Sequence, residues 1–144
     1  MNKKILIVAA NYYPKITSNL ILASKRKVYY KSKNKIALIK VPGIFEIPMV
    51  ISKNINKFDG FIALGCVIKG ETPHFDFISK STISGLMSLS IKYKKPIGNG
   101  IITCLNKKQS IDRSMTKGKK LSKNKGLESA NAVLELLSES FSIS

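Results

Sequence analysis

Residues 61–68 read FIALGCVI, an almost wholly apolar run that the polar stretch KGETPH at 69–74 follows directly. A strand buried on both of its faces has this composition, and such strands form parallel sheets covered by helices. The next residues place mostly apolar side chains at steps of three and four, which is typical of one helix face: Phe75, Ile78, Thr82, Leu86, Leu89 and Tyr93. The middle of the chain therefore predicts a strand, a loop and a helix, the repeating unit of an α/β protein.

The same alternation extends to both sides of this unit. Further strands are expected at 4–10 (KILIVAA), 36–41 and 97–103. Helices are expected from a cap at Thr17 or Ser18, at 45–55, at 107–114, and at the end of the chain with Leu127, Ala130, Leu134, Leu137 and Phe141 inward. This order predicts a single domain over residues 1–144, an α/β three-layer sandwich in which helices cover both faces of a four-stranded parallel sheet.

The chain is strongly basic, with 25 Lys and Arg against 8 Asp and Glu and a net charge of +17. Such a charge favours acidic partners, and a basic nucleic-acid-binding or scaffold protein on the same fold is the alternative function that it supports. The lysines, however, are spread through every segment, whereas a nucleic-acid interface gathers them in one stripe with aromatic side chains. We therefore expect a basic solvated surface that attracts phosphorylated small molecules, and no nucleic-acid partner.

The sequence excludes several other classes of protein. No apolar run approaches the length of about 18 residues that a membrane span needs, and no signal-peptide pattern follows the first residues, so we expect a cytoplasmic protein without a membrane partner. Cys66 and Cys104 lie far apart inside apolar runs, which predicts two buried, reduced thiols. One histidine and two scattered cysteines do not make a metal site, and no metal is expected.

Polar residues gather where the predicted strands end. Ligands of parallel sheets bind beyond the carboxyl ends of the strands, which lie here at 11–15, 41–46, 69–74 and 103–107. In the third of these segments, Gly70 and Thr72 precede a helix whose free backbone N–H groups can hold an anion, and Thr72 is a candidate cap. His74, the one histidine, can take and give protons near neutral pH, although it also fits a surface position in the first turn of a helix.

Two further charged residues are candidates for the same site. Glu46 lies among apolar residues in VPGIFEIP at 41–48, where a carboxylate needs a protein donor or ligand hydroxyls as a partner. It also fits a carboxylate that interacts with a helix dipole. Arg113 has a guanidinium suited to phosphate oxygens, and it equally fits a solvated arginine on a short helix.

In combination, these stretches resemble the lumazine synthase family. The matching pieces appear in order along nearly the whole chain, from about residue 5 to residue 137: Ile16-Thr17-Ser18 after the aromatic Tyr12, VPGIFEIP at 41–48, ALGCVIKGETPHFDFI at 63–78, Ile111-Asp112-Arg113 and Asn124-Lys125-Gly126. The resemblance implies a flavodoxin-like fold and a transferase of riboflavin biosynthesis. Such an enzyme condenses 5-amino-6-(D-ribitylamino)uracil with 3,4-dihydroxy-2-butanone 4-phosphate to 6,7-dimethyl-8-ribityllumazine, releasing phosphate and water. That reaction has no redox step, so the resemblance implies no cofactor.

The resemblance also implies roles for individual residues. His74 would be the catalytic residue that moves protons during imine formation and elimination. Tyr12, where the family usually has phenylalanine, would stack on the pyrimidine. Ile44, Phe45 and Glu46 would bind the ribityl chain, and the backbone of Val67 and Ile68 the uracil edge. The remaining substrate-binding residues would be Gly70, Glu71 and Thr72 around the phosphate, with Asn99, Arg113 and Lys125.

Family sites are completed between subunits of a homopentamer, so Arg113 and Lys125 are expected to come from a neighbouring subunit. Asn99 replaces a common phenylalanine, and Glu71 replaces a common alanine, so we expect the Glu71 carboxylate to point outward, toward Lys69. We expect a free pentamer and no sixty-subunit shell, because the first core strand starts at about Lys4 and the lysine-rich segment 114–124 is longer than in many members. The short alternating strands of a β-barrel, which the neighbouring enzyme riboflavin synthase would show, are absent from the pattern.

Overall fold

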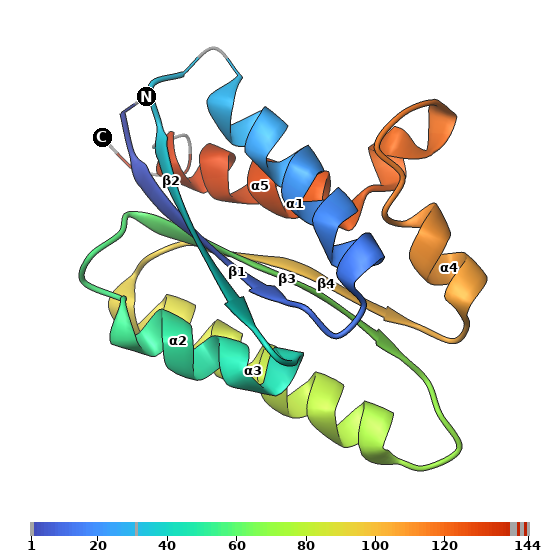
Figure 1. Cartoon of the computed structure of the whole chain (residues 1–144). Helices are drawn as coiled ribbons and strands as arrows, with labels where there is room; N and C mark the ends of the chain where they lie inside the picture. Colours follow the sequence, from blue (N-terminus) through green and yellow to red (C-terminus); the bar gives the residue numbers. More distant parts are fainter. Residues whose placement is uncertain (1, 31, 139–140, 142, 144) are drawn as a thin grey trace.

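A computed structural model describes residues 2–30, 32–138, 141 and 143 of the chain (Figure 1). Its strands are β1 (Lys4–Ala10), β2 (Lys35–Val41), β3 (Gly60–Ile68) and β4 (Ile97–Cys104). Its α-helices are α1 (Pro14–Tyr29), α2 (Ile47–Lys53), α3 (His74–Tyr93), α4 (Lys107–Asp112) and α5 (Lys125–Leu137), and two 3-10 helices are η1 (Ile44–Glu46) and η2 (Lys119–Lys123). The predicted alternation of strands and helices is confirmed.

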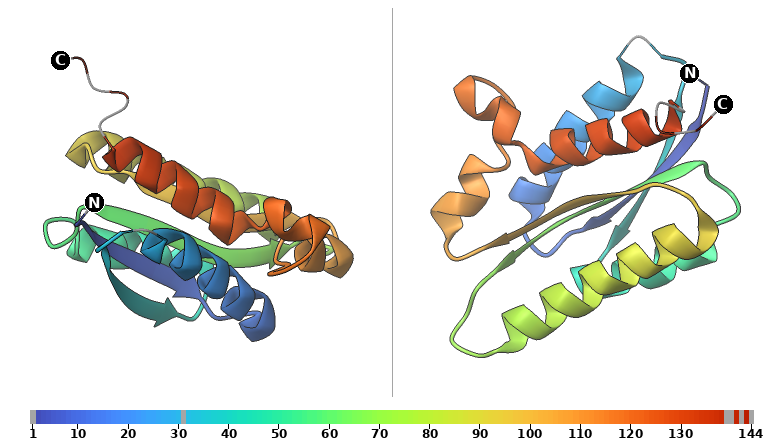
Figure 2. Two further views of the ribbon diagram at one scale, coloured as in Figure 1. Left: turned by 90° about the horizontal axis from the view of Figure 1, so that it is seen from above. Right: turned by 180° about the vertical axis from the view of Figure 1, so that it is seen from behind.

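The four strands form one parallel sheet in the order β2-β1-β3-β4. Helices α1 and α5 cover one face and α2 and α3 the other, and the view from behind in Figure 2 shows the sheet between these two layers. Each face has its own apolar core, one including Ile7 and Leu20 and the other Leu6 and Phe61. The predicted flavodoxin-like three-layer sandwich is therefore confirmed.

The two central strands are buried on both faces, which explains their continuous apolar runs. All side chains from Ile5 to Ala10 in β1 and from Phe61 to Cys66 in β3 are buried, whereas the edge strand β2 is mostly half-buried. Gly65 in β3 leaves room for η1, because a Cβ at this position would lie 2.8 Å from Cγ2 of Ile44. Close contact with β3 thus holds the turn Ile44–Glu46 at the carboxyl edge of the sheet.

Two element boundaries differ from the prediction. Helix α1 begins at Pro14, and neither Thr17 nor Ser18 caps it, because the buried hydroxyl of Thr17 donates to the carbonyl oxygen of Ala10 at 2.7 Å. The helix expected at 45–55 is divided into η1 and α2, and Pro48 lies in the first turn of α2, where its missing N–H costs no helical hydrogen bond.

The ends of two helices also fall short of the prediction. The helix expected at 107–114 ends at Asp112, and the terminal helix ends at Leu137, so Phe141, which was expected on its inward face, is exposed. At its start, α5 is capped by Asn124, whose side-chain oxygen accepts from the N–H groups of Gly126 at 2.8 Å and Leu127 at 3.1 Å. A Cβ on Gly126 would collide with the backbone of Leu20, so glycine lets α5 lie directly against α1 and fixes the position of Lys125 beside it.

Within the described residues, none of the helices combines the length and the apolar character needed to cross a bilayer.

Candidate active site

A cavity of about 420 Å³ lies at the carboxyl ends of β1, β2 and β3, where the sequence predicted a site. We call it the first cavity. It is lined by Tyr12, Tyr13, Gly43, Ile44, Phe45, Glu46, Cys66, Val67, Ile68, His74 and Ile78. The sheet brings these segments together, since the N–H of Asn11 donates to the carbonyl of Val41 at 2.8 Å and ties the chain after β1 to the end of β2. Seven of the predicted site residues therefore share one cavity.

The polar side chains of the first cavity come from two different turns. The Glu46 carboxylate lies over Gly43, whose position for a Cβ is 3.8 Å from Oε2 of Glu46. In the described part of the chain, the structure shows no hydrogen bond or ion pair to this carboxylate, and its lining position leaves it open to a ligand hydroxyl. His74 is the first residue of α3, and its backbone N–H donates to Oγ1 of Thr72 at 3.4 Å. Pro73 and not Thr72 is the N-cap of α3, so the predicted cap is wrong, although the Thr72 hydroxyl still accepts this one contact just before the helix. The His74 side chain lines the cavity.

The loop Gly70–Thr72 borders the first cavity without lining it. All three residues are exposed, and Gly70 has no atom within 4 Å of the position of a Cβ. The N–H of Lys69 donates to the carbonyl of Cys104 at 2.9 Å, which fixes the start of the loop. Among the described residues the ion pairs are Lys120–Asp112 and Lys125–Glu128, so the expected contact of Glu71 with Lys69 is absent, although Glu71 is exposed as expected.

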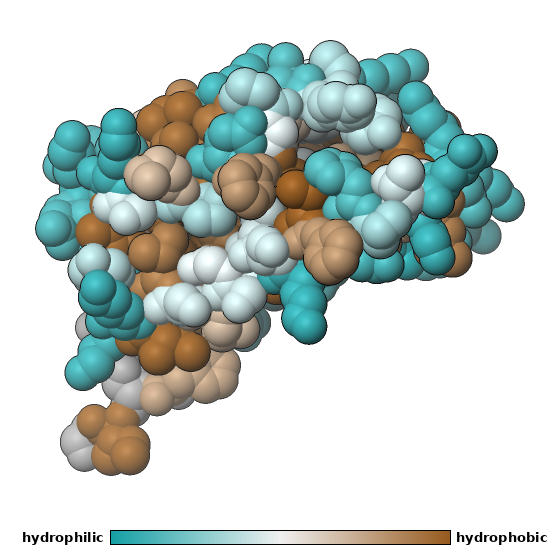
Figure 3. Space-filling view, turned by 90° about the horizontal axis from the view of Figure 1, so that it is seen from below, coloured by the Kyte–Doolittle hydropathy of each residue, from teal (hydrophilic) through white to brown (hydrophobic). Residues whose placement is uncertain are grey.

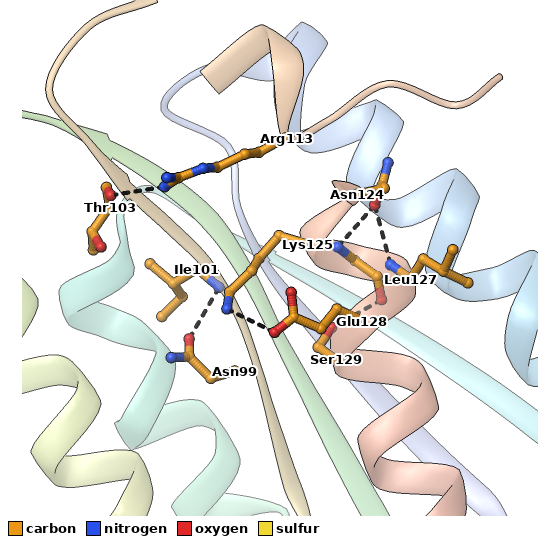
Figure 4. A network of polar contacts seen from close by, with 10 residues as sticks. Asn99, Ile101, Thr103, Arg113, Asn124, Lys125, Leu127, Glu128 and Ser129 are labelled. Carbon is orange, nitrogen blue, oxygen red and sulfur yellow. Dashed lines mark hydrogen bonds and ion pairs between the residues drawn. The ribbon is translucent and has the colours of Figure 1, made fainter. Parts of the chain in front are cut away.

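The remaining predicted residues lie at a second cavity of about 630 Å³ between β4 and α5. Figure 4 shows the polar contacts around it. It is lined by Asn99, Ile101, Ile102, Thr103, Arg113, Ser122, Lys123, Lys125 and Glu128. Because β4 is an edge strand, this second cavity opens on a side of the sheet that no further strand of the described chain covers.

Two of the three cations that line the second cavity, Arg113 and Lys125, are held by long contacts. Nη1 of Arg113 donates to the carbonyl oxygen of Thr103 at 3.3 Å, and Nζ of Lys125 lies 3.3 Å from Oε1 of Glu128 (Figure 4). Exposed contacts of this kind contribute little stability, so an incoming phosphate can replace them at small cost. Asn99 is engaged differently, since its side-chain oxygen accepts from the N–H of Ile101 at 3.1 Å on its own strand.

The two cavities have no lining residue in common. One carries aromatic rings, a carboxylate and an imidazole, and the other carries an arginine and two lysines suited to phosphate. A single chain therefore presents two different sets of polar groups, each at its own cavity.

Comparison with known proteins assigns the chain to a family. The sequence matches the family 6,7-dimethyl-8-ribityllumazine synthase over residues 2–140, which includes both cavities.

The chain belongs to the lumazine synthase family.

Similar proteins named 6,7-dimethyl-8-ribityllumazine synthase come from several bacteria. The protein from Buchnera aphidicola subsp. Schizaphis graminum is 42% identical over 141 residues, which cover 94% of this chain and 86% of that protein. The protein from Campylobacter concisus is 36% identical over 140 residues, covering 94% and 87% of the two chains. The protein from Paenarthrobacter aurescens is 37% identical over 131 residues, covering 91% and 80%.

The cysteines of this lumazine synthase family member are buried and unpaired, as the sequence predicted. Burial raises the pKa of the Cys66 thiol to about 12, and the nearby Cys104 thiol adds to this effect. Burial also raises the pKa of Cys104. At neutral pH both thiols therefore keep their protons, and Cys66 contributes an apolar part of the first cavity wall and no nucleophile.

Three cavity residues were not predicted as site residues, although a feature of the sequence points to each of them. Cys66 shares the period-two face of β3 with Leu64 and Ile68, which predicts its side. Tyr13 directly follows Tyr12 at the end of a strand. Glu128 stands three residues after Lys125 on a helix, the spacing at which opposite charges meet.

Proposed function

We propose that this chain is a transferase that makes 6,7-dimethyl-8-ribityllumazine from 5-amino-6-(D-ribitylamino)uracil and 3,4-dihydroxy-2-butanone 4-phosphate. The observation that carries the proposal is the first cavity, which unites Tyr12, Glu46 and His74 at the carboxyl edge of the sheet. An aromatic ring, a carboxylate and a proton-transferring group are what a planar, hydroxyl-rich amine requires from a protein. The family to which the chain belongs supports the same reaction.

In the first cavity, the pyrimidine stacks on Tyr12 and meets the backbone of Val67 and Ile68. The ribityl chain extends along Ile44–Glu46, where the carboxylate of Glu46 accepts hydrogen bonds from its hydroxyls. This role gives a partner to a carboxylate that has none among the described residues and that lies beside apolar side chains.

His74 moves the protons of the reaction. The amine of the uracil attacks the ketone of the butanone, and a water leaves as the imine forms. The phosphate is then eliminated, the ring closes on the carbonyl carbon, and a second water leaves. Each step takes a proton from one atom and gives it to another, and an imidazole at the start of α3 on the cavity wall can do both near neutral pH.

The phosphate binds between two subunits. The backbone N–H groups of Gly70–Thr72, in the loop that precedes α3, lie beside the first cavity and form one half of the phosphate site. Arg113 and Lys125 of a second copy supply the other half, and Asn99 of that copy closes the wall next to the pyrimidine. The separation of the two cavities on one chain supports this arrangement, because neither is complete without the other.

A second copy of the chain also covers the outer face of α2 and α3. Large apolar side chains are exposed here: Phe45 of η1, Met49 of α2, and Phe77, Met87 and Ile91 of α3. The view from below in Figure 3 shows brown patches among the polar residues of this side. A groove of about 530 Å³ between the two helices, lined by Pro48, Met49, Gly85 and Leu89 among others, adds to it. Apolar patches of this kind are typical of interfaces between subunits.

The subunits assemble as a homopentamer in the cytoplasm, and each is a single catalytic domain over residues 1–144. Unpaired Cys66 and Cys104 fit a reducing compartment. A closed ring of subunits gives every subunit both of its half-sites. The orange segment between α4 and α5 stands out from the body in Figure 1 and carries Lys117, Lys119, Lys120 and Lys123, of which Lys120 pairs with Asp112 at 2.7 Å. The remaining positive charge opposes the docking of pentamers into a shell.

The reaction itself is tested by mixing both substrates with the purified protein and following the absorbance of the lumazine. We expect turnover by the wild type and about 10²-fold slower turnover by His74→Ala, since a lost general acid and base costs about 10²–10⁴-fold. Lys80→Ala, an exposed change on the same helix, is the matched control and keeps the wild-type rate. Equal rates for His74→Ala and wild type at saturating substrates would show that the proton-transfer role is wrong.

Arg113→Ala and Glu46→Gln are expected to affect different substrates. Loss of a charge-assisted contact to phosphate costs about 1.5–3 kcal/mol, so Arg113→Ala raises the KM of the butanone phosphate and leaves the KM of the uracil nearly unchanged. Glu46→Gln is expected to raise the KM of the uracil and to leave the KM of the butanone phosphate nearly unchanged. Arg26→Ala is the control, because Arg26 also donates to a backbone carbonyl, that of Thr116, away from both cavities. An equal loss for both substrates in Arg113→Ala would indicate a structural role.

Native mass spectrometry tests the assembly. We expect a species of five times the chain mass of 15.9 kDa. A dominant species of twelve pentamers would contradict the effect assigned to the lysine-rich segment, and a stable, active monomer would contradict the shared site.

A further inference from the structure

Tyr12 needs a neighbour that sets the orientation of its ring. Its side chain is 73% exposed at the mouth of the first cavity, and a side chain with so much free surface changes rotamer readily. The ring packs against that of Tyr13, with centroids 5.0 Å apart and planes inclined at 75°. This edge-to-face geometry is a favoured arrangement of aromatic pairs, and it restricts the rotation of the more exposed ring.

Tyr13 is itself held firmly. Its backbone carbonyl accepts from the N–H of Thr17 at 3.0 Å, which places it at the start of α1, and the Thr17 hydroxyl ties this turn to Ala10 in β1. The Tyr13 ring is half-buried against the apolar core that also contains Ile16, Cys66 and Cys104. Burial raises the pKa of its hydroxyl, consistent with this packing.

Lys107 also contacts the Tyr13 ring. Its Nζ lies 5.7 Å from the centroid of the ring, within the range of a cation–π contact. Lys107 is the first residue of α4, and two side-chain hydrogen bonds fix the start of that helix. The side chain of Asn106 accepts from the N–H of Gln109 at 3.0 Å, and the side chain of Gln109 accepts from the N–H of Leu105 at 2.8 Å. The ammonium group is therefore presented from a well-anchored turn.

Tyr13 also separates two cavities. It lines the first cavity together with Tyr12 and His74, and it lines a different cavity of about 410 Å³ together with Lys107 and Ile111. Tyr13 thus lies between α4 and the aromatic wall of the first cavity.

We propose that Tyr13, held by Lys107, is a positioning residue that orients the Tyr12 ring for stacking on the pyrimidine. The inference rests on the proposed function, in which Tyr12 contacts the uracil. Without Tyr13, the Tyr12 ring loses its rotational freedom only when the substrate binds. This loss of conformational entropy weakens binding and raises the KM of the uracil. The butanone phosphate, which binds at the loop Gly70–Thr72, is not affected.

The test compares the KM values of both substrates in four variants. Tyr13→Leu removes the ring and raises the KM of the uracil about 3–10-fold, while the KM of the butanone phosphate stays within about twofold. Tyr13→Phe keeps the ring and restores a KM close to that of the wild type. Lys107→Met removes the charge and raises the KM of the uracil about 2–5-fold. Lys108→Met, the matched control on the next residue of α4, has no effect.

A double-mutant cycle shows whether Tyr13 acts through Tyr12. In a chain that already carries Tyr12→Leu, the further change Tyr13→Leu is expected to leave the KM of the uracil within about twofold, because the ring to be oriented is gone. Additive effects of the two changes would overturn the inference, since Tyr13 would then act on the substrate or the fold independently. Equal losses in Tyr13→Phe and Tyr13→Leu would also overturn it, because the hydroxyl and not the ring would matter.

The failure of the inference can be told from the failure of the proposed function. If Tyr12→Leu raises the KM of the uracil and Tyr13→Leu does not, the positioning role is wrong while the stacking role of Tyr12 stands. If Tyr12→Leu leaves that KM unchanged, the assignment of Tyr12 is wrong and the positioning role falls with it. If the wild type forms no lumazine, the proposed function is wrong.

Discussion

The parallel pairing of β1 and β3 at the centre of the sheet is the constraint on which the rest of the structure depends. Val8 is paired with Ala63 and Ala9 with Leu64, and this register brings the carboxyl ends of both strands to the same edge. Both strands are buried on both faces. A shift of their pairing by one residue would therefore disrupt the apolar cores on both sides of the sheet at once. The segments that follow these strands, which include Tyr12 and His74, therefore meet at a fixed place.

The same sheet places Arg113 and Lys125 away from the first cavity. Strand β4 lies at the edge, α5 packs beside it against α1, and Arg113 and Lys125 line a cavity that shares no residue with the first. In the proposed function, Arg113 and Lys125 stay held by a carbonyl and a carboxylate until a substrate binds between two subunits. The exposed apolar face of α2 and α3 supports the proposed association of subunits.

The order of strands and helices could be predicted from sequence because two-faced burial leaves continuous apolar runs and helices leave steps of three and four. The cap of α1 could not be predicted in this way. The buried hydroxyl of Thr17 donates to the carbonyl oxygen of Ala10, a contact that forms only when β1 and α1 pack together. The break between η1 and α2 was also missed, because a 3-10 turn and an α-helix share nearly the same apolar spacing. Motifs placed Glu46 and His74 correctly at one cavity, whereas the distribution of site residues over two cavities follows from β4 being an edge strand, which short-range patterns do not reveal.

The central claim is that one site is built from two copies of the chain, and mixed oligomers test it most directly. His74→Ala lacks a group of the first cavity and Arg113→Ala a group of the second, so each oligomer alone has only defective sites. After co-expression in equal amounts, roughly a quarter of the sites combine an intact first cavity with an intact second one if subunits arrange at random, and activity should recover to about that fraction of the wild type. Mass spectrometry would establish that mixed oligomers have formed. Activity in those oligomers no higher than the average of the two variants would contradict a shared site.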